Sequence, residues 1–536
     1  MKIKSLTTHL YATGLILLLV SCEEITTDLS HLNENPDAVE ELNPSYMFTF
    51  SQLGLHGNFQ SYVWTASQAM QHFSTQHEVP APGDKYFSET GARAMWQWYT
   101  GGTSAQTGVS TAGLRNIQRV IREVEGSPED VNKLSAARII KVYIFHIMTD
   151  IHGDIPYSEA LRADEGILQP KYDTQEEIYI DMLNELDEAA SAFTAGQPTF
   201  GGADLFYNGD VVQWQQFAYS LMLRLAMRLT EVREDLAEEY VRKAIEGGVI
   251  TEDADIAKID YSGSGTEAER SPKAEHLLLV DFYNPQANRE NRHGGKYSAT
   301  FIDQLKETDD PRLEAISVVW RPSNQPDRLV DMYTDPEMQE GLESGVHFNT
   351  PANYSDLSEP HPNTVLNHDS PMLVMTNAET YLLLAEASLR GWYSGSEEEA
   401  YNEAVRAGMR QWALFGSDGI ISADRIETYL EDNPYPASGT FEERLDRIST
   451  EKWTSLFLDY YEVWANWRRT GYPELTPANY PGNITGGTIP RRLIIPDSEL
   501  NDNEENFLDA LERQGVGNDY TSTVWWDPMH PQQQLN

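Results

Sequence analysis

Cysteine is almost absent from this chain. Its 536 residues include a single one, Cys22, so no disulfide can form within one molecule. The fold therefore has to be stabilised by the size of its buried core, and a chain of this length can bury a large one.

Positive charge is also scarce. The chain has 39 lysines and arginines against 84 aspartates and glutamates, which gives a formal charge of −45 at pH 7. Such a surface repels nucleic acid and anionic lipid, so we exclude nucleic acid as a partner. The hydrophobic content of 40% and the aromatic content of 10% are too high for a disordered acidic chain, so a packed core is expected.

Long apolar runs are missing beyond the first residues. Two lysines precede an apolar run from Leu10 to Val20, which is the layout of a secretory signal and is too short to span a bilayer. Leu19-Val20-Ser21-Cys22 resembles the lipobox of bacterial lipoproteins. We expect residues 1–21 to be a signal peptide and Cys22 to carry a lipid. The alternative is a plain secretory signal in which the cysteine is accidental.

A lipid on Cys22 would hold the mature protein on the membrane without a spanning segment. No later part of the sequence offers about 18 uninterrupted apolar residues. Residues 22–43 are polar and predict a flexible tether with an r.m.s. span of roughly 25 Å. Residues 44–536 are expected to form a single helical domain.

Helical periodicity dominates this domain, so the predicted fold class is mainly α. Apolar residues recur at three- and four-residue spacing in seven segments. These segments are Ala136–Met148, Glu176–Phe193, Trp214–Leu229, Leu236–Glu246, Ala378–Leu389, Glu398–Trp412 and Ser449–Trp467.

The two predicted helices around Gly391 indicate how helices pack. Gly391 ends the first helix, and Ala400, Ala404 and Ala407 give small contact positions on the second. Small residues allow two helices to approach closely, as in tetratricopeptide-type pairs. The period is not repeated cleanly, so we predict scattered helix pairs and no regular solenoid.

Proline, glycine, asparagine and aspartate break the periodicity in four segments, which we expect to be long loops. They are residues 256–275, 281–298, 320–370 and 431–441. Long loops in a compact domain usually carry function, because the regular elements supply the packing.

Ten short motifs are spread along nearly the whole chain. They are Asn33–Asp37, Thr149–Ala160, Pro170–Asp173, Tyr207–Asp210, Ser220–Arg228, Asp310–Arg312, Leu384–Ala387, Glu451–Trp453, Trp467–Pro473 and Ile489–Leu493. In this order they resemble the SusD/RagB family of outer-membrane lipoproteins, and specifically its SusD-like branch. The Gly-Asp-Ile-Pro-Tyr-Ser-Glu-Ala sequence at 153–160 resembles the signature of that family.

The resemblance implies an α-helical lipoprotein with tetratricopeptide-like helix pairs on the surface of Bacteroidetes-type bacteria. Members act as the lid of a TonB-dependent (SusC-like) outer-membrane receptor and bind glycans in many cases and peptides in some. Glu23-Glu24 resembles the acidic signal that directs such lipoproteins to the outer face. We therefore expect capture of an oligosaccharide for a transporter, with no cofactor and no enzymatic activity. Peptide capture is the first alternative; a surface glycan hydrolase and a purely structural lipoprotein are the others.

The Gly153 motif also has a structural interpretation. Gly153 permits a tight turn, and Asp154 can accept hydrogen bonds from backbone amides at the start of the next helix. Asp150, His152 and Asp154 could in principle ligate a metal. Because they lie at a helix end and a turn, capping is the favoured interpretation and no metal is predicted.

Other polar motifs favour a scaffold over catalysis. Arg224 and Arg228 lie one turn apart on an apolar helix, so we expect them to pair with carboxylates, and Arg468 and Arg469 to do likewise. The sequence contains no His-Glu-x-x-His, Gly-x-Ser-x-Gly or phosphate-binding Gly-x-x-x-x-Gly-Lys motif. Gly263-Ser264-Gly265 is a partial dinucleotide fingerprint that we interpret as a loop.

Aromatic residues are the best lead to a ligand site. Sugar rings present apolar faces that stack on indole and phenol rings, while their hydroxyls need polar groups at the rim. The predicted ligand-binding residues are Trp96, Trp98 and Tyr99, beside glycines, and Tyr283, Trp320 and Tyr354, in the later irregular region. We expect the segment with Trp96, Trp98 and Tyr99 to form a shallow aromatic platform together with Trp320 and Tyr354. The alternative for each ring is a place in the core.

Overall fold

Helices form most of the part of the chain that the computed structural model describes. The described residues are 43–56, 62–75, 83–86, 96–101, 113–266, 269–280, 295–324, 330–346 and 356–529. Pro44–Asn536 form one compact unit. The mainly α fold class predicted from the periodicity is confirmed.

The α-helices range from single turns to the 22-residue α6. Their bounds are α2 Pro44–Leu53, α4 Gln97–Thr100, α5 Gly113–Val124, α6 Val131–His152, α7 Gln175–Ala192, α8 Val211–Arg228, α9 Glu234–Gly247, α10 Pro272–Val280, α11 Ala299–Glu307, α12 Arg312–Ile316, α13 Asn377–Leu389, α14 Glu397–Arg410, α15 Ala423–Asp432, α16 Phe441–Ser455, α17 Tyr460–Thr470, α18 Glu499–Asp502 and α19 Glu504–Gln514.

Helix starts follow local capping chemistry. At α7 the Thr174 hydroxyl accepts a hydrogen bond from the Glu177 amide, and the Glu177 carboxylate accepts one from the Thr174 amide. At α8 the Asp210 carboxylate accepts hydrogen bonds from the amides of Val212 and Gln213. These side chains satisfy amides that have no partner inside the helix, so the sequence fixes where these helices begin.

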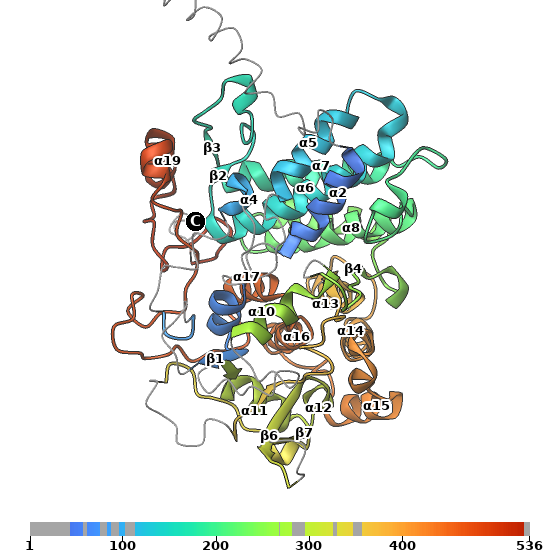
Figure 1. Cartoon of the computed structure of the whole chain (residues 1–536), viewed down its shortest axis with the longest axis vertical. Coiled ribbons are helices and arrows are strands. Elements are labelled where there is room, and N and C mark those ends of the chain that lie inside the picture. Colours follow the sequence, from blue (N-terminus) through green and yellow to red (C-terminus); the bar gives the residue numbers. More distant parts are fainter. Residues whose placement is uncertain are drawn as a thin grey trace, which may run out of the picture. The chain divides into compact units, whose positions relative to one another are not determined.

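Two groups of helices pack side by side within the unit. In the first, α5 packs on α6, α6 on α7, α7 on α8 and α8 on α9; in the second, α13 packs on α14 and α16. Figure 1 shows the first group together with α2, and the second group beside α17. Ala400, Ala404 and Ala407 are buried on α14, which packs on α13 as the small-residue pattern predicted. The predicted helix pairs are therefore present.

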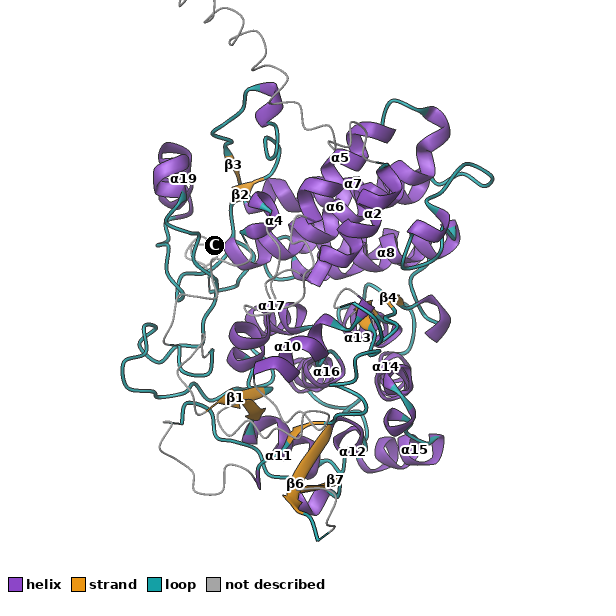
Figure 2. Cartoon of the chain, viewed as in Figure 1, coloured by secondary structure: helices purple, strands orange, loops and turns teal. Residues whose placement is uncertain are grey.

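Strands are short and pair antiparallel (Figure 2). Their bounds are β1 Phe73–Thr75, β2 Ile155–Pro156, β3 Tyr172–Asp173, β4 Ala257–Ile259, β5 Gly295–Tyr297, β6 Ser317–Pro322, β7 Val330–Tyr333, β8 Glu359–Pro360 and β9 Met372–Met375. The three-stranded sheet has the order β7-β6-β8, and the other pairs are β1-β5, β2-β3 and β4-β9.

Three local predictions were wrong in detail. The predicted helix Ser449–Trp467 is two helices, because α16 ends at Ser455 and α17 begins at Tyr460. Leu458, between them, has a φ of 86°, which no helix allows. The expected loop 256–275 contains β4 and the start of α10 at Pro272, where the missing amide proton of proline costs nothing. The expected loop 320–370 contains β7 and β8.

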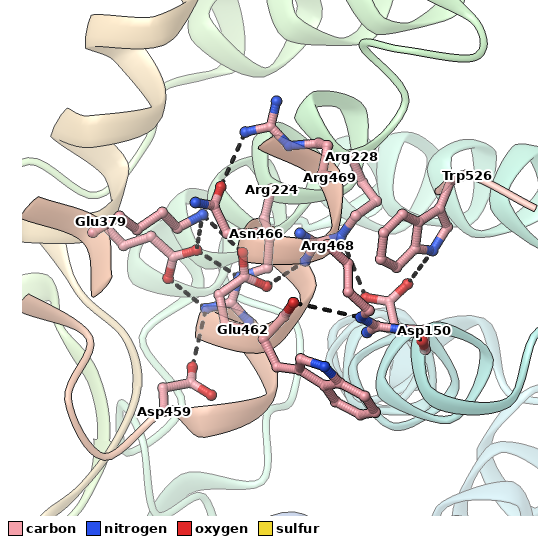
Figure 3. Close-up of polar contacts among 12 residues, drawn as sticks. Asp150, Arg224, Arg228, Glu379, Asp459, Glu462, Asn466, Arg468, Arg469 and Trp526 are labelled. Carbon is pink, nitrogen blue, oxygen red and sulfur yellow. Dashed lines mark hydrogen bonds and ion pairs between the residues drawn. The ribbon is translucent and has the colours of Figure 1, made fainter. Parts of the chain in front are cut away.

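Buried ion pairs connect the two helix groups (Figure 3). Arg224 of α8 contacts Glu379 of α13 at 2.5 Å, and Arg228 contacts Glu462 of α17 at 2.5 Å. Lys452 of α16 contacts the other oxygen of Glu462 at 2.7 Å. All five side chains are buried. The prediction that Arg224 and Arg228 pair with carboxylates is confirmed.

Arg468 and Arg469, neighbours on α17, have different kinds of partner. Arg469 pairs with Glu386 at 2.6 Å, as predicted. Arg468 forms no ion pair with a described residue, so that part of the prediction was wrong. It donates to backbone carbonyl oxygens at 2.6 and 2.9 Å, and its guanidinium lies 4.1 Å from the ring of Trp464 and 4.7 Å from that of Trp526. Burial lowers the pKa of Arg468 to about 9.

Candidate ligand-binding site

The indole of Trp98 belongs to the core and not to a binding surface. Its side chain, in α4, is 1% exposed, and its indole N–H donates to the Gly54 carbonyl oxygen at 3.1 Å. A ring that is covered on both faces cannot stack on a sugar. The prediction of Trp98 as a stacking residue is therefore corrected, because a neighbouring helix end covers it.

Trp96 is also covered, and Tyr99 is tied to the turn after α6. Trp96 is 5% exposed; its indole N–H donates to Glu499 Oε1 at 3.1 Å, and the centroids of its ring and the His152 ring are 5.3 Å apart in a T-shaped arrangement. The Tyr99 hydroxyl donates to the Pro156 carbonyl oxygen. These contacts give Trp96 a core position, so it too is corrected as a stacking residue. Tyr99 remains partly exposed.

Trp320 lies in a different part of the unit. It is on β6 opposite Met332 and is partly exposed, and its indole N–H donates to Glu359 Oε2 at 3.2 Å. Figure 1 shows β6 and α4 far apart along the vertical axis of the view. The predicted single platform is therefore not formed by the described residues. Tyr283 and Tyr354 lie outside the described residues.

A chain of aromatic contacts leads from Tyr99 to a cleft that the sequence did not reveal. The rings of Tyr99 and Phe145 are 6.4 Å apart, and those of Phe145 and Tyr157 are 4.6 Å apart in an edge-to-face arrangement. Beside Tyr157 is a cavity of about 400 Å³, which we call the Tyr157 cleft. Its walls come from α5, α6, α7, β3 and the turn after β2. They are formed by Gln118, Lys141, Phe145, Tyr157, Ser158, Ala160, Arg162, Asp173, Glu177, Ile178 and Asp181.

A second cavity of about 390 Å³, the arginine pocket, adjoins this cleft. Its walls are formed by Arg115, Gln118, Arg119, Arg122, Glu123, Leu161 and Asp164. Gln118 lines both cavities. Each volume falls in the range of about 300–1,000 Å³ that is usual for small-molecule sites.

The Tyr157 cleft keeps its charges in fixed places. The Tyr157 hydroxyl donates to Asp181 Oδ2 at 2.6 Å. Burial and the nearby carboxylates of Glu185 and Asp181 raise the pKa of Tyr157 well above 10, so the phenol stays neutral. Burial alone would raise the pKa of Asp173, but hydrogen bonds from Lys171 and Ser158 hold it below its ordinary value. The cleft therefore offers carboxylate acceptors beside a neutral aromatic ring.

The metal interpretation of Asp150, His152 and Asp154 finds no geometric support. Asp150 accepts from the Trp526 indole N–H at 2.8 Å, and His152 Nδ1 lies 3.1 Å from the Leu493 carbonyl oxygen. Asp154 Oδ1 accepts a hydrogen bond from the backbone amide of Gln175, the first residue of α7, at 2.9 Å, which confirms its predicted capping role. Within the described ranges, no three His, Cys, Asp or Glu side chains are grouped as metal ligands.

Comparison with known proteins decides the family. The family model described as "Starch-binding associating with outer membrane" matches residues 36–496. The chain belongs to the SusD-like family. This confirms the family predicted from the motifs, and proteins of this family are described as starch-binding and associated with the outer membrane. No functionally curated protein sequence matches the chain.

Solved structures with the SusD-like fold are similar over nearly the whole chain. A "chitin-binding protein" is 30% identical, with a TM-score of 0.75, over 90% of this chain and 100% of its own. A SusD-like protein from Bacteroidetes AC2a is 24% identical, with a TM-score of 0.77, over 91% and 100%. A chitin-binding SusD homologue from Flavobacterium johnsoniae is 23% identical, with a TM-score of 0.69, over 90% and 98%. The last two support the fold alone.

Proposed function

We propose that this SusD-like protein captures oligosaccharides at the cell surface and delivers them to a TonB-dependent outer-membrane transporter. The observation that carries the proposal is the 30% identity, over 90% of the chain, to a chitin-binding protein. The family description adds starch binding and outer-membrane association. Chitin oligosaccharides are therefore the first ligands to test, and starch oligosaccharides the second.

The membrane attachment is part of the same proposal. Cys22 lies outside the described residues, and the lipobox around it is the basis for proposing a lipid anchor there. Among the helices of the described ranges, none is both long and apolar enough to cross a membrane. An anchor with two or more acyl chains would suffice for firm attachment.

For the glycan contact we propose Trp320, together with Tyr283 and Tyr354. Trp320 is partly exposed, and its indole N–H is held by Glu359, which is itself buried beside Lys296. Holding the polar edge of the indole would keep its face in one orientation. A preoriented ring loses little entropy when a sugar stacks on it.

Calorimetric titration of the purified protein tests the proposal. We expect micromolar binding, about 8 kcal/mol, of N-acetylglucosamine or maltose oligosaccharides, since a delivery protein must also release its ligand. Trp320→Ala should weaken binding roughly ten- to a hundredfold. Tyr46→Ala, which removes a 67% exposed ring on α2, is the control and should bind normally.

The alternatives give different outcomes. Binding of peptides but of no glycan would replace the proposal by peptide capture. New reducing ends after incubation with oligosaccharides would identify a hydrolase. Gentle detergent extraction should co-purify a large β-barrel receptor, and isolation as a lone monomer in several mild detergents would count against delivery to a transporter.

A further inference from the structure

The arginine pocket is unusual for so acidic a chain. Arg115, Arg119 and Arg122 follow one another at four- and three-residue spacing, so they share one face of α5. Only 39 of the 536 residues are lysine or arginine, against 84 acids. Three guanidinium groups around one cavity therefore mark a place where a negative charge is better tolerated than elsewhere.

Two of these arginines are available to a ligand. Arg122 is engaged, because it donates to Asp164 at 2.7 Å and to the Leu161 carbonyl oxygen at 2.8 Å. Arg119 is 54% exposed and lies 4.0 Å from Glu123, beyond a hydrogen bond. Arg115 is exposed and forms no ion pair with any residue in the described ranges. A carboxylate could accept paired N–H donors from either group.

The turn between the two cavities is held in a strained conformation. Leu161 has a φ of 60°, in the left-handed region that residues with a side chain rarely adopt. Arg122 fixes this turn through the Leu161 carbonyl oxygen. Such outliers persist only where surrounding contacts hold them, and they concentrate at ligand sites. Arg122 therefore holds the wall that the two cavities share in one conformation.

The Tyr157 cleft has a different balance of charge, because its walls hold three acids, Asp173, Glu177 and Asp181, against the two cations Lys141 and Arg162. Asp181 is exposed and presents acceptor oxygens beside the ring of Tyr157, whereas Asp173 is buried and already accepts hydrogen bonds from Ser158. Carboxylates accept hydrogen bonds from hydroxyl groups and repel another anion. A ligand that spans both cavities would therefore place hydroxyl groups in the cleft and its negative charge in the arginine pocket.

We propose that the Tyr157 cleft and the arginine pocket together form a second saccharide site, selective for an oligosaccharide with one acidic sugar. A neutral sugar packs beside Tyr157 and donates hydroxyls to Asp181. Gln118, shared by both cavities, contacts the linkage region. The carboxylate of the acidic sugar accepts hydrogen bonds from Arg115 and Arg119. This site is separate from the Trp320 region and from its proposed neutral ligand.

A matched ligand pair tests the inference. The probes are a trisaccharide that ends in glucuronic acid and the same trisaccharide ending in glucose, titrated into the full chain. We expect the acidic ligand to bind at least about tenfold more tightly, since hydrogen bonds to charged groups contribute that much. This preference should shrink as salt is raised, because the arginines are exposed.

Variants then locate the site. The double variant Arg115→Gln/Arg119→Gln should abolish the preference for the acidic trisaccharide, and Tyr157→Ala should weaken both trisaccharides. Arg242→Gln is the matched control, because Arg242 is 51% exposed and its ion-pair partner among the described residues is Glu238, on α9. It should leave both affinities unchanged. Melting curves identify any variant that fails to fold, and Gln118→Ala then replaces it as the test.

Two results would overturn the inference: a wild-type protein without preference between the two trisaccharides, or a preference that survives the double arginine variant. Chitin-oligosaccharide binding, measured on the same samples, reports on the proposed function separately. Retained chitin binding with no acidic preference contradicts this second site alone. An acidic preference that depends on the arginines, in a protein that binds no chitin or starch oligosaccharide, contradicts the proposed ligand alone.

Discussion

Glu462 is the residue whose neutralisation should cost most in stability. Its carboxylate lies 2.5 Å from Arg228 and 2.7 Å from Lys452, and a third cation, Arg224, is 3.7 Å away. Burial alone would raise the pKa of Glu462, but these cations hold it well below its ordinary value. The ionised form is therefore the one that the folded protein stabilises.

Glu462→Gln removes this charge and keeps the shape, so no cavity opens. It leaves buried cations with fewer compensating anions, and breaking a buried pair in this way costs about 3–5 kcal/mol. The matched control is Glu238→Gln on α9. Its pair with Arg242, at 2.6 Å, is 43% and 51% exposed, so its loss should cost about 0.3–0.5 kcal/mol.

Urea unfolding at pH 7, followed by tryptophan fluorescence, measures the difference. Both variants should unfold with the slope of the wild-type protein, so the change in midpoint reports the change in free energy. We expect the Glu462→Gln midpoint to fall several times further than that of Glu238→Gln. Equal shifts in the two variants would refute the reasoning that the buried ion pairs determine stability.

Three further predictions concern the lipid anchor, a core tryptophan and the pH dependence of stability. Cys22→Ala should move the protein from the membrane fraction to the soluble fraction; continued attachment would contradict the lipid anchor. Trp98→Ala should lower the free energy of unfolding by about 3–5 kcal/mol and leave the glycan affinity of the folded protein unchanged. Trp320→Ala should weaken glycan binding and leave the free energy of unfolding unchanged. Burial lowers the pKa of three histidines to about 3: His72, His146 and His152. As the pH falls below 6.5, each histidine takes up a proton in the unfolded chain but stays neutral in the folded protein. Each one should therefore lower the free energy of unfolding by up to about 1.4 kcal/mol per pH unit between pH 6.5 and pH 3. The raised pKa of Asp459, about 6, opposes this loss below pH 6, and urea midpoints at pH 7.5 and 5 check the net fall.

Features that depend on neighbouring residues could be predicted from the sequence. The capping position of Asp154 and the small contact face of α14 were both expected, and both are present. Helix periodicity and caps act within a few residues, so the chain carries them wherever it folds. The break between α16 and α17 was missed, because both sides of it are apolar with helical spacing.

The candidate site depended on contacts between distant residues. Tyr157 was interpreted only as part of a turn, and the cleft beside it needs Gln118, Phe145 and Asp181 from three different helices. Nothing in the spacing of these residues shows that they share a cavity. Trp98 was equally ambiguous, because an aromatic ring in a glycine-flanked segment suits a binding surface and a core equally well.

The sequence by itself determined the family, the helical fold class and the pairing of Arg224, Arg228 and Arg469 with carboxylates. Tertiary structure decided which carboxylates those are: Arg224 meets Glu379, 155 residues later, and Arg228 meets Glu462, 234 residues later. It also decided that Arg468 is held by carbonyl oxygens and indole rings instead. Periodicity reports which face of a helix is buried, but what covers that face is set by packing between segments that are far apart in the chain.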